Sequence, residues 1–301
     1  MSKMERFKKV YEGKYKLLLL VPFVLLILAI AQIGVQFAVT GDFVNKGISL
    51  KGGSTITIQG NFDDNQQLDL QSFLREKFTR ADITVRKISS AGITSALGID
   101  SDAQDNEEIS ALLLAIENKL GIDSDTYTVE VTGSSLGNQF FKQTLWALAL
   151  AFVLMGIVVF LYFRTVIPSC AVILAAASDM VITLAIFNLT GMKLGSAGIA
   201  AFLMLIGYSV DTDIMLSTKM LKQTRKSIME RVYGAMKTGL TMTTTTFIAV
   251  LIAFILAKSD IVRQIMIILA IGLLVDVLMT YIQNVGILRM YLEKKQRKGE
   301  K

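Results

Sequence analysis

The sequence lacks the side chains on which many enzyme and metal sites depend. Its 301 residues include no histidine and a single cysteine, Cys170. Disulfide frameworks, zinc sites built from cysteine and histidine, and mechanisms that use a histidine base are therefore excluded within this chain. Polar residues are scarce for a soluble domain of this size, because 52% of the residues are hydrophobic and the mean hydropathy is +0.53. This composition indicates a membrane protein.

A recognisable nucleotide site is also missing. The glycine-rich stretch 47–53 lacks the Gly-Lys-Ser/Thr ending of a phosphate-binding loop, and it precedes a predicted strand rather than a helix. We interpret it as a tight turn into that strand. No catalytic constellation appears elsewhere in the sequence, so we expect a chain that is not an enzyme, that needs no cofactor or metal, and that draws no energy from ATP.

Six apolar runs are long enough to cross a bilayer, which takes about 20 largely apolar residues. The first follows a basic leader, but it is longer than the apolar region of a secretory signal peptide, which runs about 7–15 residues, so we interpret it as a retained helix. The predicted spans are 17–39, 143–163, 168–189, 196–218, 238–257 and 264–290.

The net charge of +6 is distributed in a way that predicts the topology. Lysine and arginine collect in the amino-terminal segment 1–16, in the connection 219–237 and in the tail 291–301, whereas the opposite short loops hold only Lys193, Lys258 and Arg263. Short cytoplasmic loops carry an excess of these residues. We therefore expect a multi-pass protein of the cytoplasmic membrane with both termini in the cytoplasm and 40–142 outside. The charge pattern does not suggest nucleic-acid binding.

The extracytoplasmic segment 40–142 has the size of one folded domain. Alternating and helical spacings predict, in order, a strand, a helix, two strands, a helix and a last strand. This βαββαβ order is typical of a ferredoxin-like α+β domain. The predicted elements are 54–58, 68–78, 83–85, 92–99, 105–120 and 127–131.

Two carboxylates, Asp211 and Asp213, fall inside the fourth predicted span. An ionisable residue at bilayer depth costs roughly 2.5–3.5 kcal/mol, so by default it marks an ion path, a proton relay or a binding contact. Two residues along a helix turn the side chain by about 200°, so the two acids face different surfaces. Gly207 lies one turn before Asp211 and leaves room beside it, so we expect Asp211 to be the inward acid.

Other spans carry polar side chains as well. Asp179 lies near the middle of the third span, and Asp276 begins a polar stripe on the sixth with Thr280 and Gln283. On the fifth span Thr241 and Thr245 share a face, and we expect them to support helix packing. No lysine or arginine lies in the middle of any span. A carboxyl group buried without a cation favours its neutral form, so the pattern predicts a proton relay with Asp211, Asp213, Asp179 and Asp276 as candidates.

Four local motifs resemble the SecF family, the smaller membrane subunit of SecDF protein-export complexes in the resistance-nodulation-division (RND) superfamily. They are the glycine-rich entry 47–53, the segment 133–140, the Gly-Tyr-Ser-Val stretch 207–210 and the threonine-rich stretch 238–245. Three positions depart from the bacterial pattern, namely Ser49, Ser178 and Asp211-Thr212-Asp213, and in these the chain is more similar to the archaeal branch.

The resemblance implies half of an RND-type transporter, which has twelve helices in two halves. It implies a bundle of six transmembrane helices with one external domain, pairing with a SecD-like second half-unit. It also implies partners in the SecYE-type translocon, the translocating polypeptide and membrane lipid, with the proton-motive force promoting export.

Two alternatives come from other classes of protein. One is an RND-type half-unit that exports small molecules or lipids. The other is an intramembrane aspartyl protease, because Asp179 and Asp211 lie on successive helices and two carboxylates can share a proton. The stretch before Asp211 lacks the Gly-x-Gly-Asp pattern of such proteases, which disfavours the second alternative.

Overall fold

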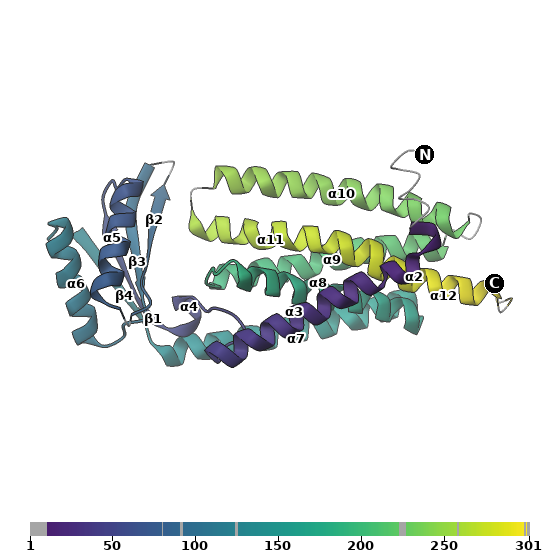
Figure 1. Ribbon diagram of the computed structural model, residues 1–301, viewed down its shortest axis with the longest axis horizontal. Helices are drawn as coiled ribbons and strands as arrows, with labels where there is room; N and C mark the ends of the chain where they lie inside the picture. Colours follow the sequence, from purple (N-terminus) through teal and green to yellow (C-terminus); the bar gives the residue numbers. More distant parts are fainter. Residues whose placement is uncertain are drawn as a thin grey trace.

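The computed structural model describes residues 11–79, 81–90, 93–123, 126–222, 227–257, 259–297 and 299. It separates into a bundle of long helices and an α+β domain at one end of the bundle (Figure 1). Helices α2 and α12 lie at the opposite end of the bundle from this domain. The predictions that concern residues 1–10, Gly92 and Lys258 lie outside the described residues.

Within the described residues, six helices are long and apolar enough to cross a membrane, as predicted. The first span joins α2 to α3, and the sixth runs from α11 through the π-helical segment η2 into α12. Their bounds are α2 (Tyr15–Leu18), α3 (Leu20–Thr40), α7 (Ser134–Phe163), α8 (Val166–Leu189), α9 (Ser196–Lys222), α10 (Ile228–Leu256), α11 (Asp260–Leu278), η2 (Met279–Asn284) and α12 (Val285–Arg297).

The helices differ in how much of their apolar surface the bundle covers. Helices α8 and α9 are the most buried spans, whereas α7 lies at the periphery and exposes most of its apolar side chains. Trp146 on α7 is 78% exposed, and Ile27 on α3 is 66% exposed. Large apolar surfaces of this kind mark contact with lipid or with another membrane chain.

The α+β domain, which the sequence predicts to lie outside the membrane and which we call the external domain, has the predicted βαββαβ order. Its sheet has the strand order β2-β3-β1-β4 with every neighbouring pair antiparallel. Each β-α-β unit leaves one strand between its two strands, which resembles the split arrangement of ferredoxin-like domains. The elements are β1 (Gly53–Gln59), α5 (Asp64–Lys77), β2 (Thr84–Ser90), β3 (Ile93–Ser101), α6 (Asn106–Leu120) and β4 (Tyr127–Thr132).

The core of this domain lies between the sheet and its two helices, which cover the side away from the membrane helices (Figure 1). Ile56, Ile99 and Ile116 are fully buried there. Helix α5 starts earlier than predicted because Asp63 forms a capping box with Gln66. Alternation thus predicted the strands well, while a polar cap extended a helix beyond its apolar residues.

The glycine-rich stretch is more than the predicted turn. It contains a short helix, α4 (Ile48–Lys51), which packs against the start of α7. Gly52 has a φ of 91°, and a Cβ there would lie 2.5 Å from Cα of Ser134. A Cβ on Gly137 would lie 2.8 Å from the backbone nitrogen of Gly52. Two separate glycine motifs therefore meet and form the joint between the external domain and the membrane helices.

This joint predicts a large effect of Gly52→Ala. The added Cβ meets backbone atoms, and the left-handed φ disfavours any L side chain, which typically costs about 1–3 kcal/mol before the clash is counted. We expect a lower melting temperature of the purified protein in detergent and faster proteolysis at the joint.

The matched control is Gly133→Ala, because nothing lies within 4 Å of a Cβ at that position. Its melting temperature should stay near that of the wild type. Equal melting temperatures for Gly52→Ala and Gly133→Ala would contradict the role of Gly52 in the joint.

Candidate functional site

Three carboxylates from three different helices lie in the interior of the bundle. Asp179 of α8, Asp213 of α9 and Asp276 of α11 each have no exposed surface. Asp179 interacts electrostatically with both other carboxylates, and Asp213 interacts with Asp276. We call these three residues the carboxylate cluster. The structure therefore brings together three of the four acids that the sequence singled out.

Hydroxyl and amide groups, rather than cations, contact the carboxylate cluster. Oδ1 of Asp213 accepts hydrogen bonds from Oγ1 of Thr280 at 2.9 Å and from Nδ2 of Asn284 at 2.8 Å. Oγ1 of Thr280 also lies 3.1 Å from Oδ1 of Asp276. Neither carboxylate oxygen of Asp179 has a hydrogen-bond partner among the described residues. These contacts are the type by which a buried carboxyl group is stabilised without an ion pair.

The position of Thr280 has a chemical consequence. A hydroxyl group has one proton, so Thr280 can direct a linear hydrogen bond at only one of Asp213 and Asp276 at a time. Both contacts are linear hydrogen bonds only if one carboxyl group is protonated and donates to the Thr280 oxygen. The geometry therefore suits a site that holds one proton between Asp213 and Asp276.

The sixth span is adapted locally to this arrangement. Residues Met279–Asn284 form a π-helix, a rare geometry that is frequent at functional sites. The wider turn places Gln283 and Asn284 in the interior together with Thr280, and all three are fully buried. Nε2 of Gln283 donates to Oγ of Ser178 on α8 at 3.1 Å. The stripe predicted at Asp276, Thr280 and Gln283 is thus buried as one unit, and it ties α8, α9 and α11 together.

The expectation that Asp211 is the inward acid is wrong. Asp211 is exposed on the surface of the bundle, and Asp213 is the buried acid. The helical angle did separate the two acids as predicted, but the rotation of α9 is set by Ser209, Leu216 and Ser217, which face the interior. The space beside Gly207 is open, with no atom within 4 Å of a Cβ placed there. The space beside Gly207 therefore lies on the outside of the bundle, and its presence did not identify the buried face of α9.

Thr241 and Thr245 contact no other helix through their hydroxyl groups. Both are exposed, and they donate to carbonyl oxygens of their own helix, Lys237 and Thr241 respectively. Thr243 is the buried threonine of this stretch. Contrary to the expectation, Gly207, Thr241 and Thr245 are exposed, and no hydrogen bond to another described helix involves the two threonines.

Several residues of the site were missed by the sequence analysis. Asn284 lies four residues after Thr280, so extending the polar stripe by one turn would have found it. Ser178 directly precedes Asp179, and Ser217 lies four residues after Asp213, where its Oγ is 3.4 Å from Nδ2 of Asn284. Such serines are common in membrane helices, and their contact with the stripe depends on helix packing.

Comparisons with known proteins agree with this architecture. The family "Protein export membrane protein SecD/SecF, C-terminal" matches residues 113–294. The protein-export membrane protein SecF of Pyrococcus furiosus is 37% identical over 98% of this chain and 97% of that protein. SecF of Methanothermobacter thermautotrophicus is 39% identical over 83% of this chain and 85% of that protein. SecF of Methanocaldococcus jannaschii is 38% identical over 94% of this chain and 98% of that protein.

Two solved structures share the fold. SecDF of Thermus thermophilus, described as a translocon-associated membrane protein, aligns with a TM-score of 0.69 and 18% identity. SecDF in a super-membrane-facing form aligns with a TM-score of 0.61 and 22% identity. They cover 94% and 93% of this chain, whereas this chain spans 38% of each SecDF chain.

The fold and the carboxylate cluster define a six-span membrane protein with one α+β domain at one end of its bundle and a cation-free polar site in the described part of that bundle. By its relatives, the chain belongs to the SecD/SecF family of protein-export membrane proteins, on the side of the archaeal SecF proteins. These relatives are named for protein export and not for solute export or proteolysis.

The contacts in the site predict the effect of Thr280→Val. This nearly isosteric change removes the hydroxyl group shared by Asp213 and Asp276, which leaves buried carboxyl groups with one donor fewer. A lost partner of a buried polar group costs about 1–3 kcal/mol. We expect a lower melting temperature in detergent, while helix content measured by circular dichroism is unchanged.

The control is Thr245→Val on α10, where the hydroxyl group is exposed and bonds only its own helix. This variant should melt within a degree or two of the wild type, since exposed substitutions typically cost less than about 0.5 kcal/mol. If the two threonine variants have the same melting temperature, Thr280 does not stabilise the cluster.

Proposed function

We propose that this chain is the SecF-type half-unit of an export complex and promotes the passage of polypeptides across the cytoplasmic membrane, driven by the proton gradient. The family assignment and the names of the relatives support the role in protein export. The shared hydroxyl of Thr280 supports the use of protons, because it joins two carboxyl groups that together accommodate one proton.

The proposed proton site consists of Asp213 and Asp276, with Asp179 as the third acid. Protonation changes the charge of the cluster, and the three acids belong to α8, α9 and α11. A change in charge inside a low-dielectric bundle alters how closely these helices pack. Asp211 is exposed, and we assign it to the contact with the partner rather than to the proton site.

The outward face formed by Gly207, Asp211, Thr241 and Thr245 is the proposed contact with a SecD-like partner. A carboxylate at this depth is costly against lipid, whereas a second protein chain can supply polar partners. Glycine and threonine allow close helix approach. This chain aligns with only 38% of each SecDF chain, and the remaining part of those chains is long enough to contain a second half-unit.

The proposed orientation places α2 and α12 toward the cytoplasm and the external domain on the other side. Basic residues lie at the α12 end of the bundle, including Lys294 and Lys295 of α12 and Lys219 and Lys222 of α9. This agrees with the excess of positive residues in cytoplasmic segments. The external domain would then lie where a polypeptide leaves a SecYE-type translocon.

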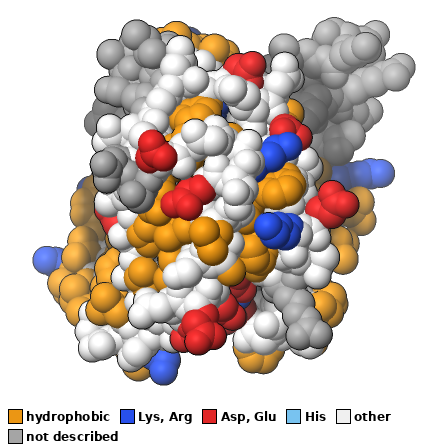
Figure 2. Space-filling model, turned by 90° about the vertical axis from the view of Figure 1, so that its left-hand side faces the viewer, with side chains coloured by type: hydrophobic (Ala, Val, Ile, Leu, Met, Phe, Trp, Pro, Cys, Tyr) orange, Lys and Arg blue, Asp and Glu red, His pale blue; other side chains and the backbone are white. Residues whose placement is uncertain are grey.

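The membrane-distal face of the external domain has mixed surface chemistry. Figure 2 shows apolar side chains interspersed with acidic and basic ones on this face. Leu68 of α5 and Leu114 of α6 are 62% and 58% exposed. Such a surface suits weak contacts with unfolded polypeptides of varied sequence, because neither charge nor apolar character dominates it.

The proposal predicts that Asp213→Asn abolishes the gradient-dependent part of export. An asparagine fits the same space but cannot gain or lose a proton. Membrane vesicles with the complete complex should still export a model polypeptide, but the increase caused by an imposed proton gradient should be lost. A retained increase would overturn the proposed function.

A second prediction concerns the partner face. Gly207→Leu adds bulk where helices of two chains approach, so we expect loss of the co-purified second half-unit. Ile27→Phe on α3, an exposed position on another helix, should keep normal amounts of partner. Equal recovery of partner with both variants would show that this face is not the contact.

A further inference from the structure

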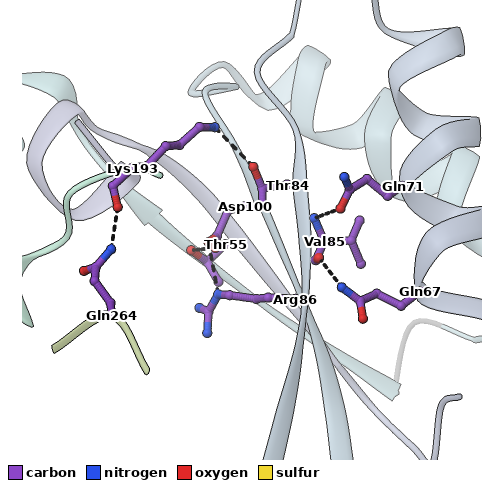
Figure 3. A network of polar contacts seen from close by, with 9 residues as sticks. All are labelled: Thr55, Gln67, Gln71, Thr84, Val85, Arg86, Asp100, Lys193 and Gln264. Atoms are coloured by element: carbon purple, nitrogen blue, oxygen red, sulfur yellow. Dashed lines mark hydrogen bonds and ion pairs between the residues drawn. The ribbon is translucent and has the colours of Figure 1, made fainter. Parts of the chain in front are cut away.

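The connection between α8 and α9 touches both the membrane helices and the external domain. Nζ of Lys193 donates to Oδ1 of Asp82 at 2.5 Å. It also donates to Oγ1 of Thr84 at 3.2 Å, as Figure 3 shows. Thr84 is the first residue of β2, which is an edge strand of the external sheet. The side chain of one lysine thus links a membrane loop to the external domain.

The backbone of the same loop is held by α11. Nε2 of Gln264 donates to the carbonyl oxygen of Lys193 at 2.6 Å (Figure 3). Oε1 of Gln264 accepts from the backbone nitrogen of Gly195 at 3.2 Å. A Cβ on Gly198 would lie 3.0 Å from Oε1 of Gln264. The side-chain amide of Gln264 therefore both donates to and accepts from the backbone of the α8–α9 loop, and the missing side chain of Gly198 leaves space for it.

The three helices that meet at this loop are the helices of the carboxylate cluster. Asp179 lies on α8, Asp213 on α9, and Asp276 on α11, twelve residues after Gln264. At 1.5 Å per residue this separation is about 18 Å along the helix. Because helices move as rigid bodies, a shift of α11 against α8 or α9 at the cluster also changes the geometry at Gln264 and Lys193.

The domain is attached to the membrane part in two different ways. At the entry to β1, backbone bonds join the loop to the preceding linker, from Gly47 N to Leu194 O at 2.8 Å and from Leu194 N to Asn45 O at 2.6 Å. At β2, where α11 also contacts the strand, the polar attachment is the Lys193–Asp82 ion pair, whose side chains are 31% and 49% exposed, together with the hydrogen bond from Lys193 to Thr84. Exposed ion pairs are weak and screened by salt, so this second attachment is the one that can open.

We propose that Lys193 and Asp82 form a releasable latch, positioned by Gln264, through which the state of the carboxylate cluster sets the orientation of the external domain. The closed latch holds the β2 edge against the α8–α9 loop. When it opens, the domain turns about the backbone joint at residues 45–53. This inference rests on the proposed function, because the protons that drive the change enter the cluster.

Thiol crosslinking in the complete complex tests the latch. In a Cys170→Ser background, the pair Asp82→Cys and Lys193→Cys is treated with a short bifunctional maleimide, with and without an imposed proton gradient. We expect the crosslinking rate to differ between the two conditions and the difference to vanish with a protonophore. The Asp213→Asn background should also abolish the difference.

The matched control pair is Asp69→Cys with Lys119→Cys, an ion pair of similar exposure between α5 and α6 within the external domain. Its crosslinking should not respond to the gradient. Gln264→Met, which keeps the length of the side chain but loses both hydrogen bonds, should make crosslinking of the latch pair independent of the gradient and leave the control pair unchanged.

Charge exchange provides a readout that does not use cysteine. Lys193→Glu and Asp82→Lys should each lose gradient-dependent export, and the double exchange should restore part of it. The corresponding exchange at Asp69 and Lys119 should have no effect on export at any stage. Recovery of the partner with the single variants is measured as well. Normal recovery shows that these chains still fold and assemble, so that a loss of export is not caused by misfolding.

The outcomes separate the latch from the proposed function. If latch crosslinking ignores the gradient while Asp213→Asn still abolishes gradient-dependent export, the latch is overturned and the proposed function stands. If Asp213→Asn keeps gradient-dependent export, the proposed function fails, and the latch fails with it. A latch that responds to the gradient in the wild type but not in Asp213→Asn supports both.

Discussion

The burial of three carboxyl groups with no cation among their described contacts is the constraint on which the membrane part of this protein depends. Asp179, Asp213 and Asp276 have no exposed surface, and the contacts described for Asp213 and Asp276 come from hydroxyl and amide groups. Such donors stabilise a buried carboxylate less than an ion pair does, so protonation is an accessible alternative. The need to place these donors explains why α8 and α9 are the most buried spans and why the sixth span contains a π-helical turn.

The same constraint links the bundle to the external domain. The helices that share the carboxylate cluster also meet at the loop of Lys193, where Gln264 bonds the loop backbone. Glycines at positions 47, 52 and 137 let the backbones of the joint approach closely. The described residues therefore combine an attachment of backbone bonds at the joint with an attachment through the exposed side chain of Lys193 at β2, which suits the proposed hinged movement of the domain.

The error about Asp211 shows which kind of information was missing. The sequence alone places both acids on α9 and predicts that they face different surfaces, which the structure confirms. It does not contain the rotation of the helix, because Gly207 is compatible with a neighbouring helix, with lipid or with a second chain. The threonines of α10 were misjudged for the same reason, since hydroxyl groups that bond their own helix need no neighbour.

What the sequence determined by itself follows from local physics: six spans from the length of the apolar runs, the βαββαβ order from the periodicity of the segment 40–142, and acids at bilayer depth from their positions inside the apolar runs. What only the tertiary structure decided are contacts between distant segments: which acid faces inward, the sharing of Thr280 by two carboxyl groups, and the meeting of Lys193 with Asp82. Those contacts depend on how the helices rotate and pack against each other, and the pattern within one helix specifies neither.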